Sequence, residues 1–383
     1  MSIEPGAWIG FLGGGQLGRM AAMAAKAMGY RIAVLDPDPH CPLSALADRT
    51  VTASFEDLEA VEQFAASCQV VTFEREDIPI AAARAANRGS ILRPEPGILE
   101  LMQDRWLQKQ WLARHGFPTA SFTPWPGEQP AQSLFPGFLK TRQGGYDGRS
   151  QAEVAAPSSL VPAWNSLGGK SCILEAKVDF AMEISVLVAR RPTGAMKVYP
   201  PAENRHHGRV LDWSVIPARI RPDLQAEAQS LGQRLAETLQ LEGVMVVEMF
   251  VLSDGTLQVN EMAARIHNSY HASERACVTG QFEQFIRAIC DLPLGQPDLV
   301  QPTAIANLLG DLWLPGPPDF VPALEKGGVR LHLYGKAQAF PGRKMGHFSS
   351  TAATADEAVT QVCLARGTLA QVRSAPPPED VAS

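Results

Sequence analysis

Two glutamates that could hold a metal ion lie on opposite sides of a predicted turn. Residues 244–252 and 256–261 are rich in strand-forming residues, and they flank Asp254-Gly255, a strong signal for a two-residue hairpin turn. That turn would place Glu248 directly opposite Glu261. Both acids stand among apolar residues, so their repulsion would be strong unless a cation or a proton lies between them.

A divalent cation would remove this repulsion. Paired carboxylates that leave room for phosphate oxygens and water suit Mg²⁺, and Mn²⁺ could take its place. The competing interpretation is a pair of exposed acids on a solvated strand face. A change of register by one residue would put the two side chains on opposite faces of the hairpin, and the metal site would be lost.

A glycine-rich loop near the N-terminus could bind an anion. Residues 13–18 read GGGQLG and fit G-x-G-x-x-G between a predicted strand (residues 8–12) and a predicted helix, with Asp36 at the end of the next strand. The pattern is typical of NAD(P) oxidoreductases. Glycines and a helix N-terminus favour any anion, however, so a sugar phosphate fits as well, and a tight turn without a ligand is a third interpretation.

A second glycine-rich loop follows Lys140, which ends an apolar strand. Residues 140–149 read KTRQGGYDGR, and a glycine-rich loop beside a fixed cation can cover nucleotide phosphates. Gly-Lys-Ser/Thr is missing, so the loop is not a P-loop. The alternative is a hairpin turn from which Lys140 reaches solvent.

Two groups of polar and basic residues lie further along the chain. Arg265, His267, Asn268 and His271 directly follow the predicted hairpin, and such a density of donors suits a phosphorylated or polar substrate. Lys336 and residues 341–347 (PGRKMGH) form a second cationic patch that could hold an anion. A solvated charged loop is the alternative for this patch.

Composition narrows the class of protein. The 383 residues contain 34 Lys and Arg against 40 Asp and Glu, a net charge of -6, and no basic run, which argues against nucleic-acid binding. The absence of a long apolar stretch and of a signal-peptide pattern favours a cytoplasmic protein that does not bind membranes. Six separated cysteines without a Cys-x-x-Cys pair are expected to be reduced and mostly buried.

The predicted elements alternate between helices and strands and indicate a mixed α/β and α+β protein. We expect a Rossmann-like domain over residues 1–97, a central domain over 98–297 and a small β-rich domain over 298–373. Residues 374–383 are expected to be a disordered tail. One helix beginning near Leu99 is expected to carry Arg105 and Lys109, and the longest helix is expected over residues 223–239.

The order of these motifs resembles the 5-(carboxyamino)imidazole ribonucleotide synthetase family of the ATP-grasp superfamily. The resemblance runs from residue 8 to residue 347. Its most specific parts are residues 13–20, 144–149, 260–261, 265–269, 281–283 and 341–347. It implies an ATP-grasp fold between a Rossmann-like N-terminal domain that binds no dinucleotide and a small C-terminal β-rich domain.

The resemblance also implies roles for individual residues. Glu248 and Glu261 would bind Mg²⁺, and Arg265, Lys140 and Asp147 would serve catalysis. The residues that would contact ATP are Arg105, Lys140, Gly145, Tyr146, Asp147, Gly148, Arg149, Gln151, Glu175, Ala176, Lys177, Val178, Glu183, His206, Asn260 and Glu261. The residues that would bind the ribonucleotide are Gln16, Leu17, Glu74, Tyr146, Asp147, His267, Asn268, Lys336, Arg343 and Lys344.

The implied reaction is a carboxylation in de novo purine biosynthesis. ATP and bicarbonate would give carboxyphosphate and ADP, and the carboxyl unit would pass to the exocyclic amine of 5-aminoimidazole ribonucleotide. A homodimer is the family's usual assembly. The alternatives are another ATP-grasp ligase or formyltransferase that acts on a phosphoribosyl amine, and the NAD(P) oxidoreductase.

Five residues depart from the family pattern and put the fine substrate geometry in doubt. Tyr270 is the most serious, because it replaces a glycine, and a large ring would not tolerate a positive φ or a close ligand. The other departures are Thr72, Ala264, Gly280 and Phe340.

Overall fold

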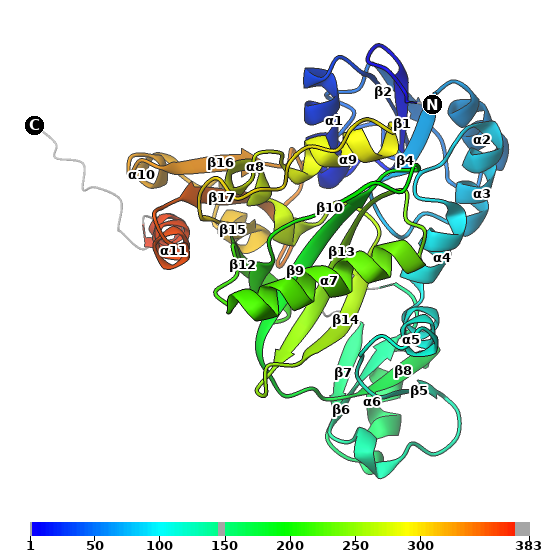
Figure 1. Cartoon of the computed structure of the whole chain (residues 1–383), viewed down its shortest axis with the longest axis vertical. Coiled ribbons are helices and arrows are strands. Elements are labelled where there is room, and N and C mark those ends of the chain that lie inside the picture. The colour runs from blue at the N-terminus through cyan, green and yellow to red at the C-terminus, as the bar shows by residue number, and fades with distance from the viewer. Residues whose placement is uncertain (1, 145–149, 372–383) are drawn as a thin grey trace, which may run out of the picture.

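Residues 2–144 and 150–371 are described by the computed structural model (Figure 1). The chain starts with a four-stranded parallel sheet in the order β3-β2-β1-β4. Its strands are β1 (Trp8–Leu12), β2 (Arg31–Asp36), β3 (Arg49–Thr52) and β4 (Val70–Phe73), and its helices are α1 (Gln16–Ala27), α2 (Leu58–Ala66), α3 (Ile80–Gly89) and α4 (Pro96–Gln103). The glycine loop joins β1 to α1 as predicted, and the parallel order brings residues after β4 beside it.

A small antiparallel sheet follows, in the order β5-β8-β6-β7. Its strands are β5 (Phe122–Trp125), β6 (Gly137–Thr141), β7 (Gln151–Val154) and β8 (Cys172–Ala176), and the helices beside them are α5 (Arg105–Arg114) and α6 (Leu160–Ser166). This sheet lies at the opposite end of the molecule from β1–β4 (Figure 1). Lys140 ends strand β6 at the edge that faces the rest of the chain.

The largest sheet has nine strands in the order β14-β13-β9-β11-β12-β15-β17-β16, with β10 paired to β9. Its strands are β9 (Phe180–Arg190), β10 (Met196–Val198), β11 (Ala202–His207), β12 (Val210–Ile216), β13 (Gly243–Leu252), β14 (Leu257–Ala263), β15 (Thr303–Leu309), β16 (Val329–Leu333) and β17 (Lys344–Thr351). The helices around it are α7 (Pro222–Thr238), α8 (Ser273–Ala276), α9 (Gln281–Ile289), α10 (Val321–Leu324) and α11 (Ala355–Gln371). Because β12 pairs with β15, the sheet continues into the C-terminal part of the chain.

Strand β9 shows why one face of this sheet can carry a polar site. Ile184, Val186 and Val188 alternate along the strand and pack with the apolar side of α7 in one buried core. Glu183 and Ser185 flank Ile184 and point to the opposite face, since successive side chains of a strand alternate. That face is covered in part by α9 and by the short 3-10 helix η3 (Asn268–Tyr270).

The helix expected to begin near Leu99 and continue past Lys109 is two helices. Helix α4 ends at Gln103, and Asp104 adopts an extended conformation as the N-cap of α5. The Asp104 carboxylate accepts hydrogen bonds from the backbone N–H groups of Trp106 and Leu107 at 2.9 and 3.2 Å. A side chain that caps a new helix interrupts the old one, and the apolar periodicity did not reveal this break.

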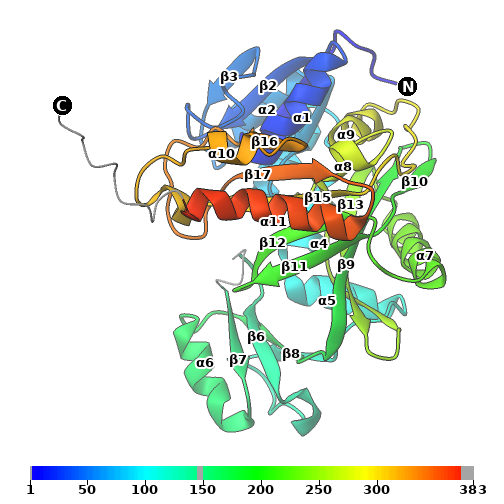
Figure 2. The ribbon, with the colours of Figure 1, turned by 90° about the vertical axis from the view of Figure 1, so that its left-hand side faces the viewer.

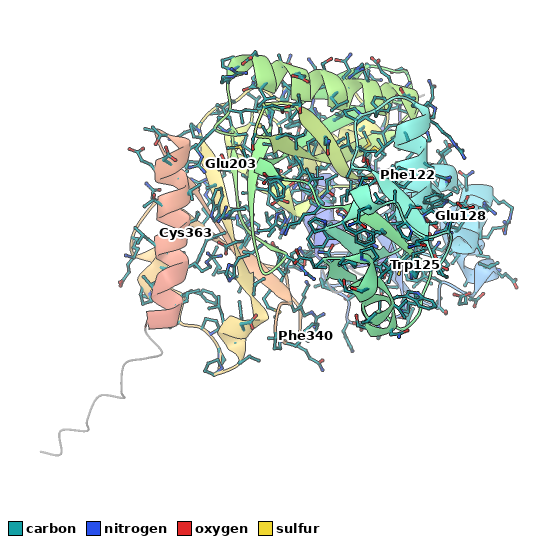
Figure 3. All side chains as sticks on the ribbon, turned by 90° about the horizontal axis from the view of Figure 1, so that it is seen from below. Phe122, Trp125, Glu128, Glu203, Phe340 and Cys363 are labelled. Atoms are coloured by element: carbon teal, nitrogen blue, oxygen red, sulfur yellow. The ribbon has the colours of Figure 1, made fainter. Side chains whose placement is uncertain are left out.

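Other predictions agree closely with the structure. Strand β1 has the bounds predicted for residues 8–12, and α7 lies within one residue of the predicted bounds at each end. All six cysteines are unpaired and five are buried, and Cys363 on α11 is half-buried (Figure 3).

Helix α11 packs along β15 and β17 (Figure 2). The expected tail, residues 374–383, lies outside the described residues, and within the described ranges no helix is long and apolar enough to cross a membrane.

Candidate active site

The turn of the β13–β14 hairpin is one residue longer than predicted. Leu252 N–H donates to the Thr256 carbonyl at 2.9 Å, and Gly255 N–H donates to the Leu252 carbonyl at 2.9 Å. The loop is therefore residues 253–255, and Gly255 takes the positive φ of 86° that such a turn requires. The two-residue turn was wrong because an Asp-Gly pair also ends three-residue loops.

A bulge in β14 nevertheless brings the two glutamates together. Val251 pairs with Leu257 and Met249 with Val259, but the register shifts by one residue after Met249, so Glu248 pairs with Glu261. The extra residue is Asn260, and Asn260 and Glu261 line the same cavity. The predicted pairing is confirmed, although two deviations from the predicted hairpin cancel to produce it.

The charge on this pair fits a cation site. Burial, and then the charge of Glu261, raise the pKa of Glu248 to about 7. No cluster of three or more His, Cys, Asp or Glu side chains suited to a metal occurs in residues 2–144 and 150–371. Two carboxylates with few further protein ligands are the donor set that Mg²⁺ uses when phosphates and water complete its shell. The residues present therefore fit Mg²⁺.

Two lysines and a glutamate form the wall of the same cavity. Lys140 Nζ lies 2.8 Å from the Glu175 carboxylate, and Lys109 Nζ lies 3.7 Å from it. Burial raises the pKa of Glu175, but the charges of Lys140 and Lys109 outweigh burial and lower it. Burial lowers the pKa of Lys109. The other lining residues are Arg105, Gln108, Asn260 and Glu261, so the cavity lies between the small sheet and the nine-stranded sheet.

Arg105 joins helix α5 to the second glycine loop. Its guanidinium donates to the carbonyls of Thr141 and Gly144 at 2.8 and 3.0 Å, and its backbone N–H donates to the Arg142 carbonyl at 2.9 Å. Gly145, Tyr146, Asp147, Gly148 and Arg149 lie outside the described residues. Gln151 begins β7 directly after them and pairs with Lys140.

The remaining residues assigned to ATP lie on the strands around the cavity or at their ends. His206 Nδ1 lies 2.7 Å from the Glu183 carboxylate; burial lowers the pKa of His206, but Glu183 raises it more. Ala176 ends β8 and donates its backbone N–H to the Ser121 carbonyl at 2.9 Å. The exposed Lys177 follows and pairs with Glu153 on the surface at 2.8 Å. Val178 follows as a half-buried residue.

The first glycine loop already binds two carboxylates of the chain itself. Gly14 N–H donates to Asp36 at 2.7 Å, and Gly15 N–H donates to Glu74 at 2.8 Å. A side-chain Cβ at Gly15 would lie 2.4 Å from a Glu74 oxygen, so carboxylate and backbone are in close contact. The amides that a dinucleotide pyrophosphate would need are therefore occupied, and Asp36 holds the loop instead of standing free for a ribose. This finding removes the support for the NAD(P) interpretation.

The N-terminal end of α1, which directly follows this loop, contacts the cationic patch formed by Lys336 and residues 341–347. Lys336 Nζ donates to Gln16 Oε1 at 2.5 Å and to the Lys344 carbonyl at 2.6 Å. Leu17 packs its side chain into the core between α1 and the rest of the chain. The Arg343 guanidinium lies 4.9 Å from the centre of the exposed Phe340 ring (Figure 3). Sequence positions more than 300 residues apart thus form one basic site.

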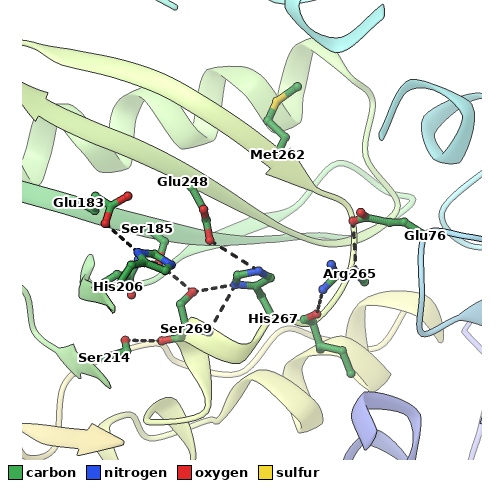
Figure 4. Close-up of polar contacts among 12 residues, drawn as sticks. Glu76, Glu183, Ser185, His206, Ser214, Glu248, Met262, Arg265, His267 and Ser269 are labelled. Atoms are coloured by element: carbon green, nitrogen blue, oxygen red, sulfur yellow. Dashed lines mark hydrogen bonds and ion pairs between the residues drawn. The ribbon is translucent and has the colours of Figure 1, made fainter. Parts of the chain in front are cut away.

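Arg265 and His267 lie on the segment between β14 and η3 (Figure 4), and Asn268 is the first residue of η3. Arg265 Nε lies 3.2 Å from Glu76, and His267 Nε2 lies 3.6 Å from Glu248. Burial lowers the pKa of His267 well below its usual value, so the ring is neutral. The Asn268 side chain is 6% exposed, and its buried amide nitrogen and oxygen have no hydrogen-bond partner among the described residues. A buried amide without partners indicates a place for a polar ligand.

Tyr270 does not have the backbone strain that its sequence position suggested. Its φ is not positive, and its ring is fully buried in the core with Tyr199 and Leu187. The Tyr270 hydroxyl donates to the Ser185 and Pro200 carbonyls at 2.9 and 3.0 Å. The ring therefore fills the core beneath η3.

Two of the other four departures from the family pattern have a local structural explanation. Gly280 is the N-cap of α9, where a Cβ would lie 2.0 Å from a Glu274 oxygen, so the glycine makes room for that carboxylate. Phe340 supports Arg343 as described above. Thr72 and Ala264 are buried, and nothing in the structure explains these two substitutions.

Sequence reasoning missed several polar residues of the site. Lys109, Glu76, Ser185 and Ser269 belong to it through their contacts with Glu175, Arg265 and His267. Glu76 follows Glu74 by two residues at a strand end, which was a usable signal. The serines carry no pattern that separates them from ordinary core hydroxyls.

Family comparisons agree with the observed architecture. The ribonucleotide synthetase preATP-grasp domain matches residues 7–103, the ATP-grasp domain matches residues 110–282, and the phosphoribosylaminoimidazole carboxylase C-terminal domain matches residues 303–361. The Brucella melitensis N5-carboxyaminoimidazole ribonucleotide synthase is 40% identical over 358 residues, covering 90% of this chain and 96% of that protein. The Bacillus subtilis enzyme of the same name is 40% identical over 365 residues, covering 94% and 95%.

Solved structures of such enzymes share the fold. An ADP complex of an N5-carboxyaminoimidazole ribonucleotide synthetase has a TM-score of 0.88 and 38% identity, covering 95% of this chain and 97% of that one. An Aspergillus clavatus N5-carboxyaminoimidazole synthase in complex with ADP and 5-aminoimidazole ribonucleotide has a TM-score of 0.86 and 31% identity, covering 95% and 99%. This chain belongs to the N5-carboxyaminoimidazole ribonucleotide synthase family of ATP-grasp ligases.

Proposed function

We propose that the chain carboxylates the exocyclic amine of 5-aminoimidazole ribonucleotide, with ATP and bicarbonate as the other substrates. The observation that carries this proposal is the Glu248–Glu261 pair, whose Glu261 lines a cavity together with Lys140 and Glu175, with the basic Gln16–Lys336 site on the same molecule. The names and ligands of the relatives support it, since solved members hold ADP and the aminoimidazole ribonucleotide. The products would be ADP, phosphate and the carboxyamino ribonucleotide.

The nucleotide would bind between the two antiparallel sheets. Lys140 and Arg105 supply positive charge for the phosphates, and Glu175 fixes the Lys140 ammonium at 2.8 Å. Asn260 lines the same cavity, and the Glu183–His206 pair lies on strands β9 and β11 of the nine-stranded sheet. Tyr146 and Asp147, with their glycine-rich neighbours, would cover the phosphates and exclude water from the labile carboxyphosphate.

Glu248 and Glu261 would hold Mg²⁺, which would neutralise the phosphate charge that develops in phosphoryl transfer. The structural support is that burial, and then the charge of Glu261, raise the pKa of Glu248 although His206 and Lys344 lower it. The Asn260 bulge directs Glu261 and the Asn260 amide into the same cavity.

The ribonucleotide would lie between the glycine loop and the C-terminal strands. The unpartnered Asn268 amide offers both a donor and an acceptor. The basic groups that suit its phosphate are those of Lys336, Arg343 and Lys344, with Gln16 fixed against Lys336. Glu74 would act by holding the loop amides of Gly15 and Gly18, which it contacts at 2.8 and 3.4 Å.

Arg265 would stabilise negative charge during phosphoryl and carboxyl transfer. Glu76, whose pKa burial raises despite the nearby charge of Arg265, holds the guanidinium at the border between the two substrate sites. Positioning and charge neutralisation are therefore the main catalytic contributions of the side chains.

One assay tests the proposed reaction. ADP release is measured with ATP, Mg²⁺ and bicarbonate, with and without 5-aminoimidazole ribonucleotide. Stimulation by this ribonucleotide is expected. Stimulation only by glycinamide ribonucleotide with formate would instead identify a formyltransferase of the same superfamily, and an absence of any ribonucleotide effect would contradict the proposal.

Three further assignments are part of this proposal. The division into three domains is supported by the family matches at 7–103, 110–282 and 303–361; the proposed boundary at 297/298 falls between two matches, whereas the first match extends past the proposed boundary at 97/98. A cytoplasmic location is supported by six unpaired cysteines. A homodimer, expected from the family, is tested by light scattering coupled to size-exclusion chromatography, where a mass of one chain would refute it.

A further inference from the structure

A row of buried polar side chains ends at His267. Asn204 Nδ2 donates to Ser185 Oγ at 3.0 Å, and Ser185 Oγ donates to Ser269 Oγ at 2.9 Å. Ser269 Oγ lies 2.9 Å from Nδ1 of His267 (Figure 4). Ser185 and Ser269 are almost completely buried, with 0% and 1% of their surface exposed. Such hydroxyls are retained in a core when their hydrogen bonds hold another group in place.

The backbone fixes the direction of the last contact. Ser269 N–H donates to Nδ1 of His267 at 3.4 Å, and a backbone N–H can only be a donor. Nδ1 is therefore an acceptor. Because Ser269 Oγ already accepts from Ser185, its own proton is available for the same nitrogen. A neutral imidazole whose Nδ1 accepts carries its proton on Nε2.

The sheet register aims this proton at the site. Ser185 pairs directly with Glu248 in the β9–β13 ladder, so both side chains lie on one face. Nε2 of His267 lies 3.6 Å from Glu248 Oε1, and this distance is too long for a hydrogen bond. The Nε2–H group of His267 can therefore donate a hydrogen bond to a ligand.

We propose that Ser269, supported by Ser185, is a positioning residue that holds His267 in the tautomer with its proton on Nε2. His267 then presents a hydrogen-bond donor to an anionic oxygen of the substrates, and it does not accept a proton through Nε2. This assignment rests on the proposed function only in placing His267 beside the ribonucleotide.

Ser214 provides a matched control. It is a fully buried serine whose hydroxyl donates to the Ser269 carbonyl at 2.7 Å, so it supports the same segment but does not contact His267. Ser214→Ala removes one buried hydroxyl and one hydrogen bond, whereas Ser269→Ala removes one buried hydroxyl and two hydrogen bonds, to Ser185 and to His267. A purely structural role of Ser269 would make Ser269→Ala and Ser214→Ala behave alike.

The first test is the ¹⁵N spectrum of the ring nitrogens in histidine-labelled, ligand-free wild-type protein, with the His267 signals identified by their loss in His267→Gln. A protonated Nε2 and an unprotonated Nδ1 are expected. A proton on Nδ1 would overturn the proposal. This measurement needs neither metal nor turnover, so its result is separate from that of the ADP-release assay, which tests the proposed function.

The second test is kinetic. Ser269→Ala is expected to lower kcat/KM for 5-aminoimidazole ribonucleotide by about ten- to hundredfold, the usual effect of removing a partner that orients a site histidine. KM for ATP should stay near the wild-type value, Ser269→Thr should restore most of the rate, and Ser214→Ala should remain close to wild type. Equal losses in Ser269→Ala and Ser214→Ala would refute a positioning role.

Discussion

Glu248 and Glu261 pair across the β13–β14 ladder only because a bulge at Asn260 offsets the longer turn at residues 253–255. Without the bulge, the register at the turn would place Asn260 opposite Glu248. A bulge that brings two acids together against their repulsion indicates a functional constraint, since a packed core would not select it.

Replacing Glu261 by glutamine should abolish Mg-ATP turnover and stabilise the ligand-free protein slightly. The charge of Glu261 contributes to the raised pKa of Glu248, so its removal relieves repulsion in the absence of a cation. ADP release and Tm check the two effects. Glu227→Gln on the exposed surface of α7 is the control and should change neither. Retained turnover in Glu261→Gln would contradict the metal assignment.

Removing the charge of Lys109 should destabilise the protein and weaken ATP binding. Lys109 is 3% exposed, and its ammonium lies 2.8 Å from the Thr119 hydroxyl and 3.7 Å from Glu175. Lys109→Met leaves Glu175 with less compensating charge, and breaking a buried pair costs about 3 to 5 kcal/mol. Urea unfolding and KM for ATP are the measurements.

The exposed Lys26–Asp48 pair is the control for that change. Lys26→Met should leave the free energy of unfolding and KM for ATP close to the wild-type values, because surface ion pairs contribute little. If Lys109→Met is no more destabilising than Lys26→Met, the Lys109–Glu175 contact does not support the cavity.

The sequence predicted the N-terminal βαβ unit, the hairpin and both groups of site donors, because glycine turns, strand alternation and charge are local signals. It did not predict that Asp104 would start a new helix or that the turn would be one residue longer. It also missed Lys109, Ser185 and Ser269, whose roles depend on contacts between distant segments. Such contacts have no signature in the spacing of residues along one element.

Acidification should destabilise the protein through the histidines near the substrate site. Burial lowers the pKa of His271 to about 3, and the unfolded value is about 6.5. The unfolded chain therefore binds more protons below pH 6.5, so the stabilisation present above pH 6.5 is lost progressively as the pH falls toward 3. At pH 5 His271 alone accounts for a loss of about 2 kcal/mol.

His271→Asn isolates this contribution, because other titrating groups are common to both proteins. The free energy of urea unfolding should fall less between pH 7.5 and pH 5 in the variant than in the wild type. Equal losses in the two proteins would show that His271 does not remain neutral in the folded state.

Tyr270 should be a structural requirement of this chain. Its hydroxyl holds the Ser185 and Pro200 carbonyls, and its ring fills the core under η3. Tyr270→Phe removes the hydrogen bonds and should cost about 1 kcal/mol, whereas Tyr270→Gly also leaves a cavity and should cost at least about 3 to 5 kcal/mol. The midpoints of urea unfolding measure both. If Tyr270→Gly folds as stably as the wild type and binds the ribonucleotide better, the ring obstructs the site instead of supporting it.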